Sequence, residues 1–149
     1  MQIASNTLAD RAANEVKYFG QGGADPYGMN VARMDSHGGW IASPSDLIKF
    51  AAQIDGLNGS EPLLKRETIG VMTTPSPANP KYAKGIMVNS ENNYWHTGSL
   101  PGTETILVRT HSKFCWSGLT NTRANFPGMS INLDWLLWHM ASKVSSWHA

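Results

Sequence analysis

The sequence predicts an α+β fold in which a three-stranded antiparallel meander packs with helices. Apolar residues recur at helical spacing after a helix-start pattern near residue 43, and again over residues 131–144. Between these segments, residues 82–120 hold short apolar runs separated by glycine, proline and asparagine, a pattern typical of strands joined by turns. Because the connections between these runs are short, we expect antiparallel strands.

The size and composition indicate one globular domain. A chain of 149 residues has the length of a single domain, which we expect to span residues 1–149. Apolar residues make up 41% of the chain and charged residues 15%, so a disordered chain is not expected. A net charge of +1, without a run of Lys or Arg, argues against nucleic acid or an anionic membrane surface as a partner.

Cysteine and histidine usage argues against disulfides and metal sites. The single cysteine, Cys115, allows no internal disulfide, and we interpret it as a small buried apolar residue. The five histidines show no metal-ligand spacing, so we expect no zinc site and no cofactor.

The sequence shows no signal peptide and no membrane-spanning segment. Residues 1–6 lack the basic and apolar stretches of a signal peptide, and no segment has a membrane-spanning length. The sequence as encoded therefore predicts a cytoplasmic protein, although a longer precursor could be exported.

The helix after residue 43 has the clearest boundaries. Ser43 suits the N-cap, Pro44 the first helical position, and Asp46 places negative charge near the positive end of the helix dipole. Gly56 is expected to end the helix. The apolar face, which should dock on a sheet or helix, consists of Leu47, Phe50, Ala51 and Ile54.

The other segments are less sharply bounded. Residues 1–39 are rich in glycine and predict irregular chain with one short helical turn. We expect a turn at 58–60, a second short helix over 65–72, and a proline-stiffened connector over 74–80. The final helix, 131–144, is apolar nearly all round, which favours a sandwiched or interfacial position.

Three strands are expected between the connector and the final helix. The first covers residues 82–89 and the third 113–120. The second lies within 94–110 and is interrupted by a turn at Gly98, Pro101 and Gly102.

The segment Tyr94–Gly102 holds the best candidate for a chemical role. His96 can donate, accept or carry charge near neutral pH, Thr97 adds a hydroxyl, and Gly98 permits a ligand or backbone to approach closely. A lone histidine on a strand is nevertheless more often structural, and His37 is expected only to shape a turn. The acidic residues that remain open as general acids or bases are Asp35, Asp46 and Glu104.

Two motifs that follow each other along the chain together indicate one family. The first is Asn30–Asp35 followed by His-Gly-Gly-Trp-Ile-Ala-Ser-Pro-Ser-Asp-Leu over residues 37–47. After the segment 82–88 comes the second, His-Thr-Gly-Ser-Leu-Pro-Gly over residues 96–102. Their combination resembles the class C branch of the serine β-lactamase-like superfamily, with its related D-alanyl-D-alanine carboxypeptidases and esterases. Nearly the whole chain takes part in the resemblance and looks like the C-terminal portion of such an enzyme.

The resemblance implies a partial β-lactamase/transpeptidase-like fold and one wall of an active site. In this family a Ser-x-x-Lys motif, a Tyr-x-Asn or Ser-x-Asn motif and a Lys/His-Thr-Gly strand meet at one cleft. By resemblance, His96 and Thr97 would orient a substrate carboxylate or tune the proton network. The backbone N–H of Ser99 would be an oxyanion-hole donor. The implied ligand is a small acyl or D-Ala-type compound.

The chain departs from the family in lacking the nucleophile. No serine has a lysine three residues later, and Ser90-Glu91-Asn92, which has the spacing of the second motif, stands in the wrong chain order and predicts a turn. His96, Thr97, Gly98 and Ser99 therefore form a candidate substrate-binding wall, and no catalytic set is complete. The chain alone is not expected to form an acyl-enzyme.

Three functional hypotheses remain open. In the first, the chain is a C-terminal fragment of a β-lactamase-related hydrolase, either a truncated part that is inactive alone or one half of a split enzyme whose N-terminal partner chain carries Ser-x-x-Lys. Alternatively, it is a non-catalytic binding or assembly module, expected to form homo-oligomers through the sheet edge near 113–120 or through the final helix with Trp135 and Trp138. The third hypothesis is a degenerate remnant that folds without a function.

Overall fold

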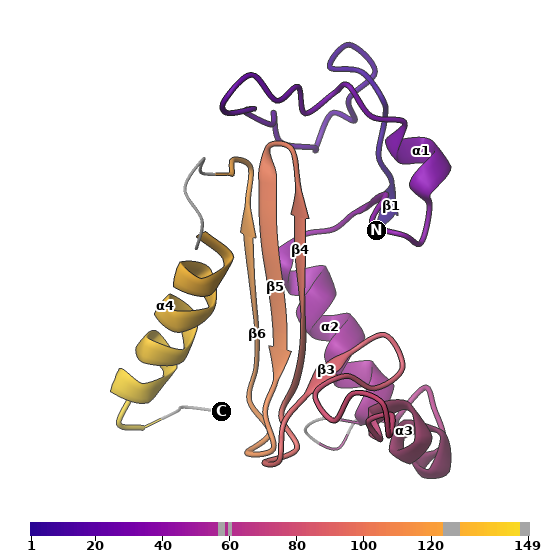
Figure 1. Cartoon of the computed structure of the whole chain (residues 1–149), viewed down its shortest axis with the longest axis vertical. Helices are drawn as coiled ribbons and strands as arrows, with labels where there is room; N and C mark the ends of the chain where they lie inside the picture. The colour runs from indigo at the N-terminus through magenta and orange to yellow at the C-terminus, as the bar shows by residue number, and fades with distance from the viewer. Residues whose placement is uncertain (57–58, 60, 124–128, 147–149) are drawn as a thin grey trace. The chain divides into compact units, whose positions relative to one another are not determined.

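The computed structural model describes residues 1–56, 59, 61–123 and 129–146 and has a mixed α+β fold (Figure 1). The predicted α+β class is therefore confirmed. Its helices are α1 (Val31–Met34), α2 (Pro44–Asp55), α3 (Arg66–Thr73) and α4 (Met129–Lys143). Its strands are β1 (Gln2–Ile3), β2 (Trp40–Ile41), β3 (Met87–Val88), β4 (Tyr94–Leu100), β5 (Thr103–Arg109) and β6 (Cys115–Thr120).

The main sheet has four strands in the order β3-β4-β5-β6, so the expected number of three is wrong. The predicted second segment forms two strands, β4 and β5, which make a hairpin around Pro101 and Gly102. Gly102 has φ 80°, the value that the second central residue of a type II turn requires after a proline. Gly98, which was expected in this turn, lies inside β4.

The strand expected over 82–89 is reduced to Met87–Val88, with one further bridge from Tyr82 to Met87. The reason is a local turn at Gly85, whose φ of 76° is incompatible with an extended strand. The N–H of Ala83 donates to the carbonyl of Ile86 across this turn. The predicted turn at Ser90 and Glu91 is confirmed.

The contacts within the chain divide it into two compact units. The first contains Met1, 42–97 and 107–117, and the second contains 2–41, 98–106 and 118–149. Strands β4, β5 and β6 each run from one unit into the other.

In the first unit, α2 begins and ends as its sequence predicts. The Ser43 hydroxyl accepts the N–H of Asp46 at 3.1 Å, while the Asp46 carboxylate accepts the N–H of Ser43 at 3.0 Å. These two bonds form a capping box. Gly56 caps the other end in the left-handed conformation, with φ 71°.

The remainder of the first unit has a small core. Ala51 of α2, Val88 of β3 and Val108 of β5 are buried, whereas Phe50 of the predicted docking face is 46% exposed. The predicted helix over 65–72 is confirmed as α3. The turn expected at 58–60 lies outside the described residues except for Gly59.

In the second unit, residues 2–41 are largely irregular, as predicted, with α1 as the one short helix among them. The unexpected feature is the pairing of β1 with β2, in which Gln2 lies opposite Ile41. The loop before α1 packs on the hairpin turn, since a Cβ at Gly102 would lie 2.8 Å from Pro26 and 3.2 Å from Tyr18.

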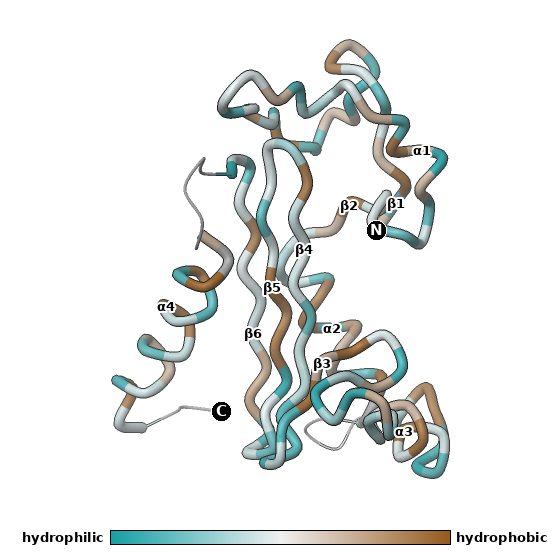
Figure 2. The backbone as a smooth tube through the Cα atoms, viewed as in Figure 1, coloured by the Kyte–Doolittle hydropathy of each residue, from teal (hydrophilic) through white to brown (hydrophobic). Residues whose placement is uncertain are grey.

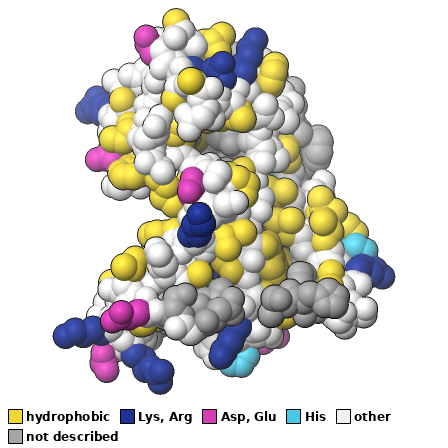
Figure 3. All heavy atoms as spheres, turned by 180° about the vertical axis from the view of Figure 1, so that it is seen from behind, with side chains coloured by type: hydrophobic (Ala, Val, Ile, Leu, Met, Phe, Trp, Pro, Cys, Tyr) yellow, Lys and Arg dark blue, Asp and Glu magenta, His cyan; other side chains and the backbone are white. Residues whose placement is uncertain are grey.

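The predicted final helix is confirmed as α4, but one stripe of it faces strand β6. A Cβ at Gly118 would lie 3.0 Å from Leu137 and 3.2 Å from Leu133. By contrast, Ile131 is 73% exposed, Trp135 62% and Met140 57%. Figure 2 shows that α4 carries both hydrophobic and hydrophilic residues. Hydrophobic side chains remain on the surface of the described residues, as the space-filling view shows (Figure 3).

Among the described helices, none is both long enough and apolar enough to cross a membrane.

Candidate active-site strand

The four candidate residues His96, Thr97, Gly98 and Ser99 follow one another in the middle of β4. The side chains of His96 and Ser99 are exposed, and Thr97 is half-buried. The boundary between the two units falls between Thr97 and Gly98. His96 and Thr97 therefore belong to the first unit, and Gly98 and Ser99 to the second.

The outer edge of β4, the one that faces away from β5, pairs with β3 only at the first residues of β4. The register pairs Met87 with Trp95 and Val88 with Tyr94, and no further strand pairs with this edge within the described part of the chain. The N–H of Asn89 donates to the carbonyl of Asn93 at 3.3 Å, so odd-numbered residues direct their backbone groups toward this edge. The alternation brings the backbone N–H groups of Thr97 and Ser99 to the open part of the edge.

His96 is held from both sides of its ring within the first unit. The hydroxyl of Tyr82 lies 3.2 Å from Nε2, and the carbonyl oxygen of Thr97 lies 2.6 Å from Nδ1. The Tyr82 and His96 rings meet edge to face, with centroids 6.2 Å apart and an interplanar angle of 71°. The imidazole therefore has a defined orientation although its side chain is exposed.

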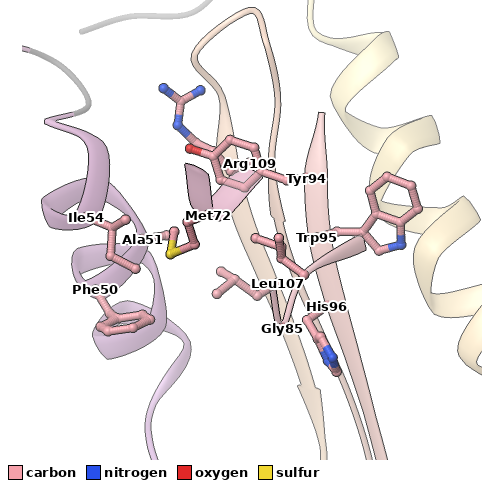
Figure 4. A pocket seen from close by; sticks show the side chains of 11 residues that line it. Phe50, Ala51, Ile54, Met72, Gly85, Tyr94, Trp95, His96, Leu107 and Arg109 are labelled. Carbon is pink, nitrogen blue, oxygen red and sulfur yellow. The ribbon is translucent and has the colours of Figure 1, made fainter. Parts of the chain in front are cut away.

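A largely apolar cavity of about 150 Å³ lies in the first unit beside this part of β4. In Figure 4, Phe50 and Ile54 of α2 face Met72 of α3 and Leu107 of β5. At one end Arg109 stands over the ring of Tyr94, with the guanidinium carbon 5.9 Å from the ring centroid. The other lining residues are Ala51, Gly85, Ile86, Trp95 and His96.

Gly98 is explained by packing between neighbouring strands rather than by the approach of a ligand. A Cβ at this position would lie 2.5 Å from the hydroxyl oxygen of Thr105 on the neighbouring strand. Strand packing in the second unit therefore already requires glycine here. Close approach of a ligand is not needed to explain the residue.

Ser99 and Glu104 form the polar pair of the second unit. The Ser99 hydroxyl donates to Glu104 Oε1 at 2.8 Å, and Arg123 Nε lies 3.9 Å from the same oxygen. Glu104 is only 4% exposed, and its backbone N–H donates to the hydroxyl of Thr120. A buried carboxylate needs such partners, so the contacts of Glu104 favour a structural role.

The other two acidic candidates make structural contacts of their own. Asp35 accepts the indole N–H of Trp40 at 2.7 Å. Asp46 belongs to the capping box of α2, where the backbone and hydroxyl of Ser43 hold the pKa of its carboxyl below the usual value. Neither contact indicates acid–base chemistry.

Sequence reasoning missed Tyr82 as a site residue. Tyr82 stands 14 positions before His96, and the strand expected over 82–89 assigned it no contact with that residue. Only the turn at Gly85 returns the chain so that the two side chains meet. No group of three metal-ligating side chains occurs among the residues that the structure describes.

Comparison of the chain with family models, with curated proteins and with solved structures found no match.

Proposed function

We propose that this chain supplies the substrate-facing strand of a serine hydrolase site related to class C β-lactamases. In this proposal the fold is the C-terminal portion of a β-lactamase/transpeptidase-like domain. The segment His96–Ser99 forms the wall, and the ligand is a small acyl or D-Ala-type compound with a carboxylate.

The observation that carries this proposal is the open outer edge of β4. The backbone N–H groups of Thr97 and Ser99 point to an edge that β3 leaves uncovered after Trp95. Free N–H groups on a strand edge bind an extended ligand by adding to the sheet, and a single one can stabilise an oxyanion. The sequence His-Thr-Gly on this strand supports the choice of a hydrolase ligand.

Catalysis requires groups that these residues do not supply. A covalent mechanism needs a nucleophile and a base, and the chain has no serine followed by lysine at the required spacing. We therefore expect the isolated chain to bind without turnover. A second polypeptide segment carrying Ser-x-x-Lys would complete the site.

A pair of substitutions at Ser99 tests the role of its N–H group. Ser99→Pro removes the N–H from the outer edge without removing a bond to β5, because this group points away from that strand. Ser99→Ala is the matched control, since it removes the hydroxyl and keeps the N–H. We expect Ser99→Pro to weaken binding of benzylpenicillin about tenfold, the effect of losing one hydrogen bond to a charged or polarised oxygen, and Ser99→Ala to change it little.

Circular dichroism of both variants checks that the fold is unchanged, so that their affinities for benzylpenicillin can be compared. Equal affinities of the two variants would contradict the proposed role of the Ser99 N–H. The catalytic half is tested by adding a Ser-x-x-Lys-bearing segment and measuring hydrolysis of a chromogenic cephalosporin. A stable complex without hydrolysis would rule out the two-part enzyme.

The exposed apolar side chains of α4 favour a second candidate function, assembly with a second copy of the chain. Ile131, Trp135 and Met140 lie on a helix whose charged side chains are Asp134 and Lys143. Association of two copies through α4 would bring the exposed apolar side chains of the two helices into contact. Burial of both apolar surfaces would then drive association.

Sedimentation velocity over a range of concentrations tests this assembly. We expect a dimer in the original chain and a shift to monomer in Trp135→Glu, which places charge on the exposed surface of α4. Lys113→Glu, at an exposed turn, is the control and should leave the dimer intact. A monomer at all concentrations of the original chain would contradict the assembly.

A further inference from the structure

The hydrogen bonds of His96 define where its ring carries hydrogen. A carbonyl oxygen can only accept, so the 2.6 Å contact with the carbonyl of Thr97 requires a hydrogen on Nδ1. In the neutral imidazole the other nitrogen, Nε2, is then an acceptor. The hydroxyl of Tyr82, 3.2 Å away, must donate to it.

Protonation of His96 reverses the second bond. In the imidazolium both ring nitrogens donate, so the bond to the Thr97 carbonyl is kept, while Nε2 now donates to the oxygen of Tyr82. The hydroxyl hydrogen of Tyr82 must then turn away from the ring. One proton comes from solvent to Nε2, and no proton leaves Tyr82.

We propose that the hydroxyl of Tyr82 is the group that meets a ligand at this point of β4, and that His96 is a positioning residue that sets whether this hydroxyl accepts or donates. Both ring nitrogens of His96 already have partners, whereas the Tyr82–His96 bond lies in an exposed position that a ligand can reach. With neutral His96 the hydroxyl presents lone pairs, and with protonated His96 it presents its hydrogen.

A carboxylate is the ligand group that distinguishes the two states, because it accepts hydrogen bonds and cannot donate them. The inference rests on the proposed function in this respect. Lys81 and Lys84 lie on the segment that carries Tyr82, and Arg109 lines the same cavity as His96. On α2 the residues that line this cavity, Phe50, Ala51 and Ile54, carry no charge.

Nitrogen-15 NMR of the imidazole tests the pairing without any ligand. In the original chain with neutral His96, we expect hydrogen on Nδ1 and none on Nε2. Tyr82→Phe keeps the ring contact and the Thr97 carbonyl, so hydrogen should stay on Nδ1, while Nε2 loses its hydrogen bond and its nitrogen-15 resonance should move to that of an imidazole nitrogen without a donor. A predominant Nε2–H form in the original chain, or an unchanged Nε2 resonance in Tyr82→Phe, would overturn the inference.

A titration with D-alanyl-D-alanine tests the role toward a ligand. We expect the dipeptide to bind about tenfold more tightly when His96 is protonated than when it is neutral, and Tyr82→Phe to lose this gain. If Tyr82→Phe retains the gain, His96 meets the carboxylate itself and the inference is wrong. If the dipeptide does not bind at either pH, the proposed function fails together with the ligand role of Tyr82, while the nitrogen-15 result still decides the hydrogen-bonded pair.

Discussion

At the residue scale, the contacts that explain the residue types differ between neighbouring positions of β4. Gly98 is required by the side chain of Thr105, His96 is oriented by Tyr82, and Ser99 donates to the buried Glu104. The His-Thr-Gly pattern drew attention to this strand, but the contacts explain Gly98 by packing alone. The groups of β4 proposed to meet a ligand are therefore the backbone N–H groups of Thr97 and Ser99 and the Tyr82–His96 pair.

Substitution of Gly98 tests the packing explanation. Gly98→Ala should destabilise the chain by about 1–3 kcal/mol, because the new Cβ would overlap the hydroxyl of Thr105. The double variant Gly98→Ala/Thr105→Ala should recover much of this loss, since the overlapping atom is removed. Urea denaturation of the single and double variants measures the coupling. Additive effects of the two substitutions would contradict the overlap.

Tyr18, in the second unit, gives a prediction for alkaline pH. Burial and the neighbouring carboxylate of Glu15 raise the pKa of Tyr18 from 10.0 to about 12. The folded chain thus holds this proton more tightly than the unfolded chain. The resulting contribution to stability is complete below pH 10 and is lost as the pH rises through about 12.

Denaturation at several pH values between 9 and 12 measures this effect. The free energy of unfolding of the original chain should fall more steeply over this interval than that of Tyr18→Phe, which has no titrating hydroxyl. Parallel curves for the two proteins would show that Tyr18 titrates equally in both states.

At the element scale, α2 shows how local chemistry defines a boundary. Ser43→Ala removes the hydroxyl that accepts the N–H of Asp46 and should cost about 1 kcal/mol. Ser45→Ala, at an exposed position two residues later, is the control and should lower the stability less. Thermal denaturation of both variants provides the measurement. Equal losses would mean that the capping box contributes nothing specific.

The helices could be predicted because their signals lie within a few residues of each boundary. Ser43, Pro44 and Gly56 define α2 without knowledge of the remainder of the fold. Residues 82–86 could not be assigned in this way, since their apolar pattern suits a strand and only the positive φ of Gly85 turns the chain. The Tyr82–His96 contact depends on that turn and therefore lay beyond the sequence pattern.

At the scale of the whole molecule, the buried apolar core is small and apolar side chains remain exposed. The buried hydrophobic residues in the described ranges are Ala4, Ala51, Val88, Ile106 and Val108. Large exposed side chains occur in both units, among them Phe50 in the first and Trp135 in the second. This distribution agrees with either proposed form of association, a completing segment or a second copy, because both would bury further apolar surface.

The amide spectrum of β4 during a titration with benzylpenicillin shows whether the open edge of this strand binds a ligand. If the open edge of β4 is the wall of a binding site, the amide resonances of Thr97 and Ser99 should shift with a common dissociation constant, and those of the hairpin turn at Gly102 should shift little. Saturable shifts confined to other segments, or no shifts at these two amides at saturating ligand, would contradict the claim.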